Sequence, residues 1–541
     1  MATETRIGAS LSSAYLTRAG RLGNADKGSY LASLRRGWLD VVFGLVGPDD
    51  EEEEEGAPEY WDAYGKIDWQ FDDATDGGIW TLWAEDRFDG QEREDGALEV
   101  VDSSYGNRWL VARGQRLWSP SAVTSARLFA GQVERERFAS ESEGSTDFMV
   151  RDDRELDVFG LASDTSLELG SRHVMSMGFE VRRYDASYDY RNARAFTDPI
   201  GAISDTEPTV RFLGEAAGEA TSLWVSDRWR LSPRLVAEIG ARYDHQSWIE
   251  DAGEDGDQIS PRLGLAWDLG ESGVVRAGWG HAHQSQRPNE LRVEDGDTRF
   301  LAAERSEHRT LGWENAFTSG RRLRVDLFQR LGRDLQPRYE NLFSPVVLFP
   351  EGSPDRVRLA PDRSRAQGLE LFVQGKPRPR FNWWVTYTYS DVERRIEGAW
   401  IPSQTDQPHA LTADVSFRVS RKWKLNAAWI YHTGWPISEL TAELVDGPNG
   451  PDIRPILGPL YGERVDDYHR LDVRLSRQFD LGKGDLQLYF DIQNLYNREN
   501  ERGYEFGEDA FLVQPDGSVR VEPEIDTWLG VVPSFGLTWS F

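Results

Sequence analysis

The densest chemistry in this sequence is a run of seven carboxylates from Asp49 to Glu55. Oxygen ligands of this kind could bind Ca²⁺, and Asp49, Asp50, Glu51 and Glu52 are the candidate ligands. In a calcium-binding loop, however, the ligands are spaced along the chain and a glycine turn supports them. An unbroken acidic run is more typical of a solvated, mobile segment, so we predict no metal site there.

The histidines are the other residues that could act as bases or metal ligands. His281 and His283 are two residues apart, so on a strand both imidazoles would lie on one face, as a metal site could use. Val275, Ala277 and Trp279 share that face, which favours an apolar, lipid-facing surface with an aromatic belt over a metal site. None of the eight histidines lies in a recognisable catalytic motif, and the 92 Asp and Glu residues form pairs by chance. We assign no catalytic residue and expect neither an enzyme nor a cofactor. The eight are His173, His245, His281, His283, His308, His409, His432 and His469.

The composition narrows the classes of protein that fit. The chain has 541 residues, a mean hydropathy of -0.59, a formal net charge of -30 and no cysteine. It is too long for one ordinary soluble core, so several domains or one large barrel are expected. No apolar run is long enough for a membrane-spanning helix. The negative charge argues against nucleic acid as a partner, because phosphate binding needs a basic face.

Apolar and polar residues alternate along much of the chain, with the period of a β-strand. In residues 381–390 the odd positions are Phe, Trp, Val, Tyr and Tyr, while the even positions are mostly polar. This register predicts that Val385 and Leu488 face lipid, whereas Thr386 and Gln487 face a polar lumen. A soluble sandwich would show the same alternation, so the connections between strands must decide.

The connections sort by length in the manner of a membrane barrel. After the first tight hairpin, short turns such as 232–233 alternate with long polar loops such as 188–218, 335–363 and 436–462. A barrel threaded through one membrane produces this alternation, with short turns on the periplasmic side and long loops outside the cell. We expect 22 strands, at 4–11, 12–20, 28–42, 58–72, 78–88, 104–117, 121–137, 154–168, 172–187, 219–231, 234–248, 258–268, 273–286, 307–316, 320–334, 364–375, 379–393, 408–419, 422–435, 463–480, 484–506 and 527–541.

The prediction is therefore an all-β, transmembrane antiparallel β-barrel of 22 strands in the outer membrane of a Gram-negative bacterium. An even strand count places both termini in the periplasm, and we expect residues 1–541 to form the barrel with no second domain. The long outer loops 188–218, 335–363 and 436–462 are the expected substrate-binding surface. The acidic run at 49–55 would lie in another outer loop, where the alternative to a solvated segment is that divalent ions bridge it to lipopolysaccharide.

The chain ends in an alternating strand whose apolar face carries Phe535, Leu537, Trp539 and Phe541. A last strand that ends in Phe resembles the recognition signal of the outer-membrane assembly machinery. In a soluble protein this strand would be an unpaired edge prone to aggregation, whereas a barrel pairs it with the first strand.

Three further stretches resemble the TonB-dependent receptors, a family of outer-membrane transporters. Residues 494–497 read Asn-Leu-Tyr-Asn, like the Asn-Leu-Phe-Asp/Asn element of the family's penultimate strand. Residues 408–436 contain Pro-His, Trp-Lys-Leu-Asn and Gly-Trp-Pro, similar to the family's rim Gln-Pro-His, Trp-x-Leu-Asn strand start and Gly-x-Pro strand end. Residues 278–291, from Gly-Trp-Gly to Gln-Arg-Pro-Asn-Glu-Leu, resemble a strand-to-loop stretch in the middle of such barrels.

The resemblance implies a receptor that binds a scarce small molecule, such as a metal chelate, a cobalamin-like compound or an oligomer, for energy-dependent uptake. Family members carry a signal peptide, an energy-coupling box and a plug domain before the barrel, and no position here matches them. Residues 1–6 also lack the basic and apolar regions of a signal peptide, which implies that an upstream segment is missing or replaced. A plug domain and the TonB energy-coupling complex are therefore expected partners of the full-length protein.

Two other functions fit the same barrel. A passive porin-like channel usually has about 16 to 18 strands and a loop folded inside its lumen. A surface adhesin or assembly scaffold would use the outer loops without transport. An inward-folded loop would favour the porin, and an upstream plug would favour the receptor. If no segment fills the lumen, we expect a wide pore with a weak preference for cations.

Overall fold

The structure is a computed structural model that describes residues 3–23, 27–39, 58–92, 99–143, 146–196, 199, 203, 209–447 and 450–541. The carboxylate run at 49–55, with the candidate ligands Asp49, Asp50, Glu51 and Glu52, lies outside the described residues. Within the described ranges, no helix is long and apolar enough to cross a membrane.

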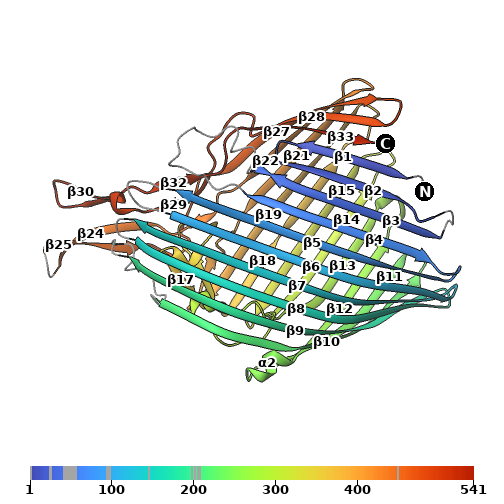
Figure 1. The fold of residues 1–541 in the computed structure, drawn as a ribbon, viewed down its shortest axis with the longest axis horizontal. Coiled ribbons are helices and arrows are strands. Elements are labelled where there is room, and N and C mark those ends of the chain that lie inside the picture. The colour runs from blue at the N-terminus through green and yellow to red at the C-terminus, as the bar shows by residue number, and fades with distance from the viewer. Residues whose placement is uncertain are drawn as a thin grey trace.

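The described chain forms a closed β-barrel whose connections carry small hairpins and helical turns (Figure 1). The barrel strands are β1 (Glu4–Ser10), β2 (Ser13–Arg21), β3 (Gly28–Trp38), β4 (Glu59–Gln70), β5 (Thr75–Glu92), β6 (Glu99–Ser119), β7 (Ala122–Glu143), β8 (Thr146–Leu169), β9 (His173–Phe196), β10 (Thr209–Ser232), β11 (Leu235–Gln246), β12 (Asp257–Asp268), β13 (Val274–Gln284), β14 (Glu304–Ala316), β15 (Arg322–Arg333), β18 (Arg363–Gln374), β19 (Phe381–Ile396), β20 (Ala399–Pro402), β21 (His409–Arg418), β22 (Trp423–His432), β27 (Tyr468–Asp480), β28 (Asp485–Gln493) and β33 (Val532–Ser540). The connections contain β16 (Arg338–Asn341), β17 (Arg356–Leu359), β23 (Pro436–Ile437), β24 (Leu440–Gly447), β25 (Gly450–Leu457), β26 (Glu463–Arg464), β29 (Glu501–Glu505), β30 (Phe511–Val513), β31 (Val519–Val521) and β32 (Glu524–Thr527), with α2 (Ser247–Asp251), η2 (Gly270–Ser272), η3 (Val293–Asp295), η4 (Pro350–Gly352) and η5 (Glu508–Ala510).

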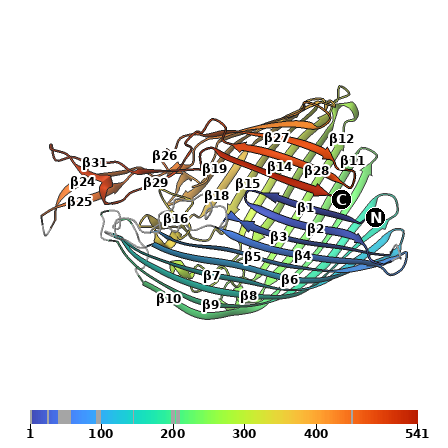
Figure 2. The ribbon, with the colours of Figure 1, turned by 45° about the horizontal axis from the view of Figure 1, so that its top comes forward.

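Neighbouring barrel strands pair antiparallel, and β1 closes the sheet by pairing with β33. β20 and β21 pair with successive stretches of β19, so together they occupy one strand position of the barrel. The sheet of 23 strands therefore occupies 22 strand positions around the barrel, and the predicted fold class is confirmed. The two chain ends lie together at the end of the barrel that carries the short turns, as Figures 1 and 2 show. There the Thr5 N–H donates to the Phe541 carbonyl oxygen at 2.7 Å.

The two faces of the strands differ as the alternation predicts. Leu488 is exposed on the outer surface of β28, and Gln487 points the other way, towards the lumen. On β19, the exposed Tyr389 shares its face with Val385, while Thr386 lies on the opposite face. The outer surface thus presents a belt of apolar side chains, and the predicted register of both strands is confirmed.

One side of the wall is taller than the sequence pattern predicts. Strands β5 to β10 have 18 to 24 residues each. On β8, the exposed Leu161 and Phe159 mark the apolar outer surface, and the outward positions of residues 151–157 are then all charged. This upper part of the wall therefore stands beyond the apolar belt.

The tall wall corrects one predicted loop. Strands β9 and β10 remain paired as far as Ala193 and Thr209, so most of the expected loop 188–218 is strand. The prediction was wrong because the apolar face changes sides above the belt. There the outward residues become charged, and the inward residues become apolar where they are covered from inside.

The predicted strand 484–506 is also too long. β28 ends at Gln493, because Asn494 and Asn497 have positive φ angles of 50° and 51°. Asparagine tolerates this left-handed conformation better than most residues, so the Asn-Leu-Tyr-Asn stretch forms a turn at the strand end. The Asn494 side-chain amide donates to the Arg498 carbonyl oxygen at 2.8 Å and stabilises the turn.

Candidate ligand-binding mouth

Two loop segments turn back into the lumen at the end of the barrel that carries the long connections. Residues 285–303 connect β13 to β14, and their Leu291 and Val293 are buried against Leu156 of β8. Leu156 lies on the face of β8 opposite the exposed Phe159, so the contact is on the lumen side. Four strands separate β8 from β13 in the barrel, so the segment crosses the interior to reach this wall. The second segment, residues 349–356, lies between β15 and β18. Its Phe349 packs against the same cluster.

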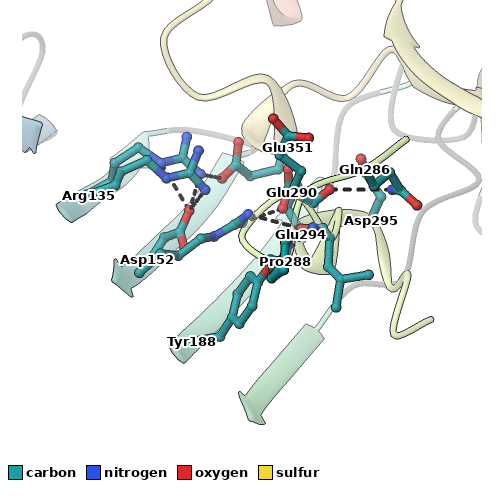
Figure 3. Close-up of polar contacts among 12 residues, drawn as sticks. Arg135, Asp152, Tyr188, Gln286, Pro288, Glu290, Glu294, Asp295 and Glu351 are labelled. Atoms are coloured by element: carbon teal, nitrogen blue, oxygen red, sulfur yellow. Dashed lines mark hydrogen bonds and ion pairs between the residues drawn. The ribbon is translucent and has the colours of Figure 1, made fainter. Parts of the chain in front are cut away.

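Three arginines of the inner wall converge on one fully buried aspartate (Figure 3). Asp152 of β8 accepts hydrogen bonds from Arg135 at 2.5 Å, from Arg137 at 2.7 Å and from Arg154 at 2.7 Å. The period of the strands brings them together, because Arg137 pairs with Asp152 across β7 and β8 and Arg135 pairs with Arg154. All four side chains therefore share the lumen face.

Loop carboxylates complete this cluster, which we call the arginine cradle: Arg135, Arg137 and Arg154. Arg154 donates to Glu294 of the first segment at 2.5 Å, and Arg137 donates to Glu351 of the second at 2.7 Å. Figure 3 shows the two glutamates approaching the wall from the loops. Each inward segment is thus held to the wall by one ion pair.

Backbone contacts strengthen both attachments. The Tyr188 hydroxyl donates to the Pro288 carbonyl oxygen at 2.5 Å and accepts the Leu291 N–H at 3.2 Å. Arg194 donates to the Glu351 carbonyl oxygen at 2.6 Å. The side chains of β9 therefore fix the path of the loop backbones over the wall.

The two inward segments are also joined to each other. Arg356 makes two hydrogen bonds of 2.7 Å to the buried Asp295. Burial raises the pKa of Asp295, and the neighbouring guanidinium acts in the opposite direction. Next to Arg356, burial raises the pKa of Asp355 to about 6, although the Asp355 carboxylate accepts the Phe343 N–H at 2.8 Å.

A second cluster joins the long connections over the same end of the lumen. The Tyr461 hydroxyl donates to Glu340 at 2.8 Å, and Arg394 of β19 pairs with the same carboxylate. Leu342 and Leu440 belong to one buried apolar group, against which Ile203 also packs. The structure thus brings the predicted stretches 335–363 and 436–462 together, and a described residue of 188–218 joins them.

The other residues singled out in the sequence lie apart from this mouth. His281 and His283 occupy the outer face of β13 with Trp279. The His283 ring lies 3.0 Å from the Ser260 hydroxyl. Throughout the described residues, no group of three or more His, Cys, Asp or Glu side chains could hold a metal ion. The C-terminal residues Phe535, Leu537, Trp539 and Phe541 lie at the outer face of the barrel, on and just after β33.

The sequence pattern missed the arginine cradle. Its signal was present, because Val150, Leu156 and Val158 are apolar on the face of β8 that should have been polar. An apolar lumen face indicates that something inside the barrel covers it. The charged residues Asp152 and Arg154 lie within this apolar stretch, so the cover had to bring partners for them.

Comparison with known proteins decides the family. A family model described as "TonB dependent receptor-like, beta-barrel" matches residues 37–495. The chain belongs to the TonB-dependent receptor family. No curated protein matches the sequence.

Solved structures of siderophore receptors share the fold of this TonB-dependent receptor. A ferric enterobactin receptor (PfeA) mutant from Pseudomonas aeruginosa is 14% identical, with a TM-score of 0.64 over 100% of this chain and 80% of that one. The siderophore receptor PiuA from Acinetobacter baumannii is 12% identical, with a TM-score of 0.65 over 100% and 81%. The ferripyoverdine receptor of Pseudomonas aeruginosa is 11% identical, with a TM-score of 0.65 over 100% and 71%.

Family membership fixes the general role. The protein is a β-barrel of the Gram-negative outer membrane, in a family of receptors and transporters that bind small molecules and interact with TonB. Its general function is nutrient uptake across the outer membrane.

Proposed function

We propose that this TonB-dependent receptor takes up a metal chelate by energy-dependent transport and recognises it at the outer mouth of the barrel. The binding surface would comprise the inward segments together with residues 335–363 and 436–462. The observation that carries this proposal is the convergence of separate loops over one lumen, joined by Glu340, Tyr461 and Arg394. The siderophore receptors that share the fold support a chelate as the substrate.

Transport in this proposal requires partners beyond the barrel. We place residues 1–541 in the barrel, with the short turns and both termini in the periplasm. A plug domain, on this polypeptide or on another, would close the lumen, and the TonB complex of the inner membrane would supply energy. The assembly machinery would read the strand that carries Phe535, Leu537, Trp539 and Phe541.

Uptake measurements test this function directly. The host strain and a strain lacking the gene are given ⁵⁵Fe bound to a panel of chelators, with and without a protonophore. We expect the gene deletion to abolish uptake of at least one chelate, a plasmid copy to restore it, and the protonophore to block it. Equal uptake of every chelate by the two strains would contradict the proposal.

A passive channel is the second candidate, because residues 285–303 fold inward as the constriction loop of a porin does. Conductance of the purified barrel in planar bilayers separates the two. A porin would give a small, steady conductance together with solute uptake that the protonophore does not affect. A receptor barrel would close when its plug domain is added, and its uptake would need energy.

A further inference from the structure

The inner wall carries more positive charge than it neutralises by itself. Asp152 supplies one carboxylate to the three guanidinium groups of Arg135, Arg137 and Arg154. Two positive charges of the arginine cradle therefore remain. The ion pairs with Glu294 and Glu351 balance them, and both carboxylates come from the inward segments.

The pairing register makes this arrangement unusual for a purely structural anchor. Arg135 and Arg154 are direct cross-strand partners on the same face. Like charges in this position destabilise a sheet unless an anion lies between them. A single arginine and a single carboxylate would anchor each loop without this penalty. The arginines instead pair with three carboxylates at once, those of Asp152, Glu294 and Glu351.

The buried packing at the cradle also leaves polar groups without partners. The Tyr190 hydroxyl is fully buried, and Tyr190 pairs directly with Asp152 across β8 and β9. It has no hydrogen-bond partner among the described residues, and neither do the donors Nε of Arg135 and Nδ2 of the buried Asn192. Buried donors and acceptors are normally satisfied, so a ligand with several oxygen atoms would find unused partners here.

We propose that the arginine cradle is an anion-binding site that the chain's own Glu294 and Glu351 occupy until an anionic ligand replaces them. The ligand carries at least two carboxylate-type groups, because two loop carboxylates must be exchanged. Guanidinium groups bind such oxygen pairs in a forked geometry that lysine cannot match. Replacement frees residues 285–303 and the segment around Glu351 from the wall, so binding and loop opening are one event. This inference rests on the proposed function, because it names the chemistry of the bound chelate.

The competition predicts how affinity responds to each partner. A ligand that must displace a tethered competitor binds more weakly than one that finds the site free. Removing the charge of Glu294 and Glu351 should therefore strengthen binding, although it removes ion pairs from the structure. Removing the charge of Arg137 and Arg154 should abolish it.

Calorimetry on the purified, detergent-solubilised barrel at low ionic strength tests this, with citrate and ferric citrate as probes. We expect the double variant Glu294→Gln, Glu351→Gln to bind at least about tenfold more tightly than the unaltered chain. Arg137→Gln with Arg154→Gln should show no binding. Binding of citrate alone would identify the carboxylates as the recognised group, and binding of ferric citrate alone would identify the intact chelate.

The matched control is Glu290→Gln. Glu290 lies in the same inward segment but pairs with the exposed Arg287 and not with the wall, so its affinity should equal that of the unaltered chain. Heat-modifiable migration in electrophoresis verifies that each variant has a folded barrel, and Glu294→Gln alone replaces the double variant if that does not fold. Hydrogen exchange of residues 285–303 should rise when citrate binds to the unaltered chain.

Unchanged or weaker binding by the glutamate variants, or binding that survives the arginine variants, would overturn the proposal. Either result would leave the cradle as a structural anchor only. The assay needs neither TonB nor a plug domain, so it is independent of uptake. Citrate binding with no chelate uptake would refute the proposed transport function and leave this site standing.

Discussion

At the scale of single residues, the mouth depends on buried charges that form ion pairs with one another. Asp152 has no exposed surface and serves three arginines. Taking charges out of water is costly, and close ion pairs recover that cost only when every partner is present. The residues of the inner wall are therefore much less tolerant of substitution than their neighbours on the outer face.

Adjacent aspartates test this contrast. Asp152→Asn should reduce the free energy of unfolding of the surrounding wall by about 3 to 5 kcal/mol, because it leaves buried arginines uncompensated. Asp153→Asn should cost less than about 1 kcal/mol, because Asp153 faces outward and pairs with the exposed Arg151. Urea unfolding followed by tryptophan fluorescence in detergent measures both, and equal losses would contradict the assignment of faces.

The loop carboxyl group of Asp355 predicts a dependence on pH. Its pKa is raised to about 6, so the folded loop holds a proton that the unfolded loop releases at lower pH. Its contribution to loop stability is therefore greatest at acidic pH and is lost as the pH rises from about 4 through 6. Amide exchange in residues 342–355 should be faster at pH 7.5 than at pH 5, after correction for intrinsic rates.

The control for this effect is Asp355→Asn, which keeps the shape and an acceptor for the Phe343 N–H. In that variant the slow amide exchange that residues 342–355 show at pH 5 should persist at pH 7.5. An unaltered pH dependence in Asp355→Asn would assign the effect to another group.

At the scale of elements, the alternation of apolar and polar residues was sufficient to locate the barrel strands. Every expected strand overlaps an observed one, because each crosses an apolar belt with one face towards polar surroundings. The pattern failed where that environment ends. Above Phe159 the lumen face of β8 is covered by residues 285–303. The apolar residues of that face indicate a cover, but nothing in β8 identifies a segment more than 100 residues away.

The site was only partly predictable for the same reason. Long polar loops marked residues 335–363 and 436–462, and these do converge. The cradle needs Arg135 and Arg154 in register, which depends on the pairing of β7 with β8. It also needs Glu294 from a loop that crosses the lumen, and the sequence alone does not specify that path.

Neighbouring residues of β19 test the assignment of faces. An arginine at a lipid-facing site near the membrane midplane costs about 2 to 4 kcal/mol, whereas a lumen site accepts it at little cost. Val385→Arg should therefore lower the folded fraction in lipid vesicles, and Thr386→Arg should not. Heat-modifiable migration measures both, and equal losses would reject this register.

At the scale of the whole molecule, the long connections that the structure describes lie at one end of the barrel and both chain ends lie at the other (Figure 1). This polarity predicts which sites can be reached from outside the cell. Single cysteines at Asp446, in the β24–β25 hairpin, and at Lys483, in a short turn, provide the comparison. A membrane-impermeant maleimide should label Asp446→Cys on intact cells and leave Lys483→Cys unlabelled. The reverse result would invert the orientation.

The end of the chain should control assembly. Phe541 closes the barrel through backbone hydrogen bonds with Thr5, and its ring packs beside Trp539. Phe541→Ala keeps the backbone contacts but removes the terminal aromatic ring. We expect slower appearance of folded barrel in a pulse-chase experiment, with the final thermal stability little changed. Phe535→Ala, which alters the same face away from the terminus, should assemble at the normal rate.

Pairing between the first and last strands also determines when the edge of β1 becomes protected during assembly. Because β1 pairs with β33, one edge of β1 stays unpaired in the assembling sheet until the last strand joins it. An unpaired edge can pair with strands of other chains. Because β1 has only seven residues, it provides few backbone groups for such pairing. A barrel closed by its first and last strands can therefore pair with the wrong chain until the last strand is in place.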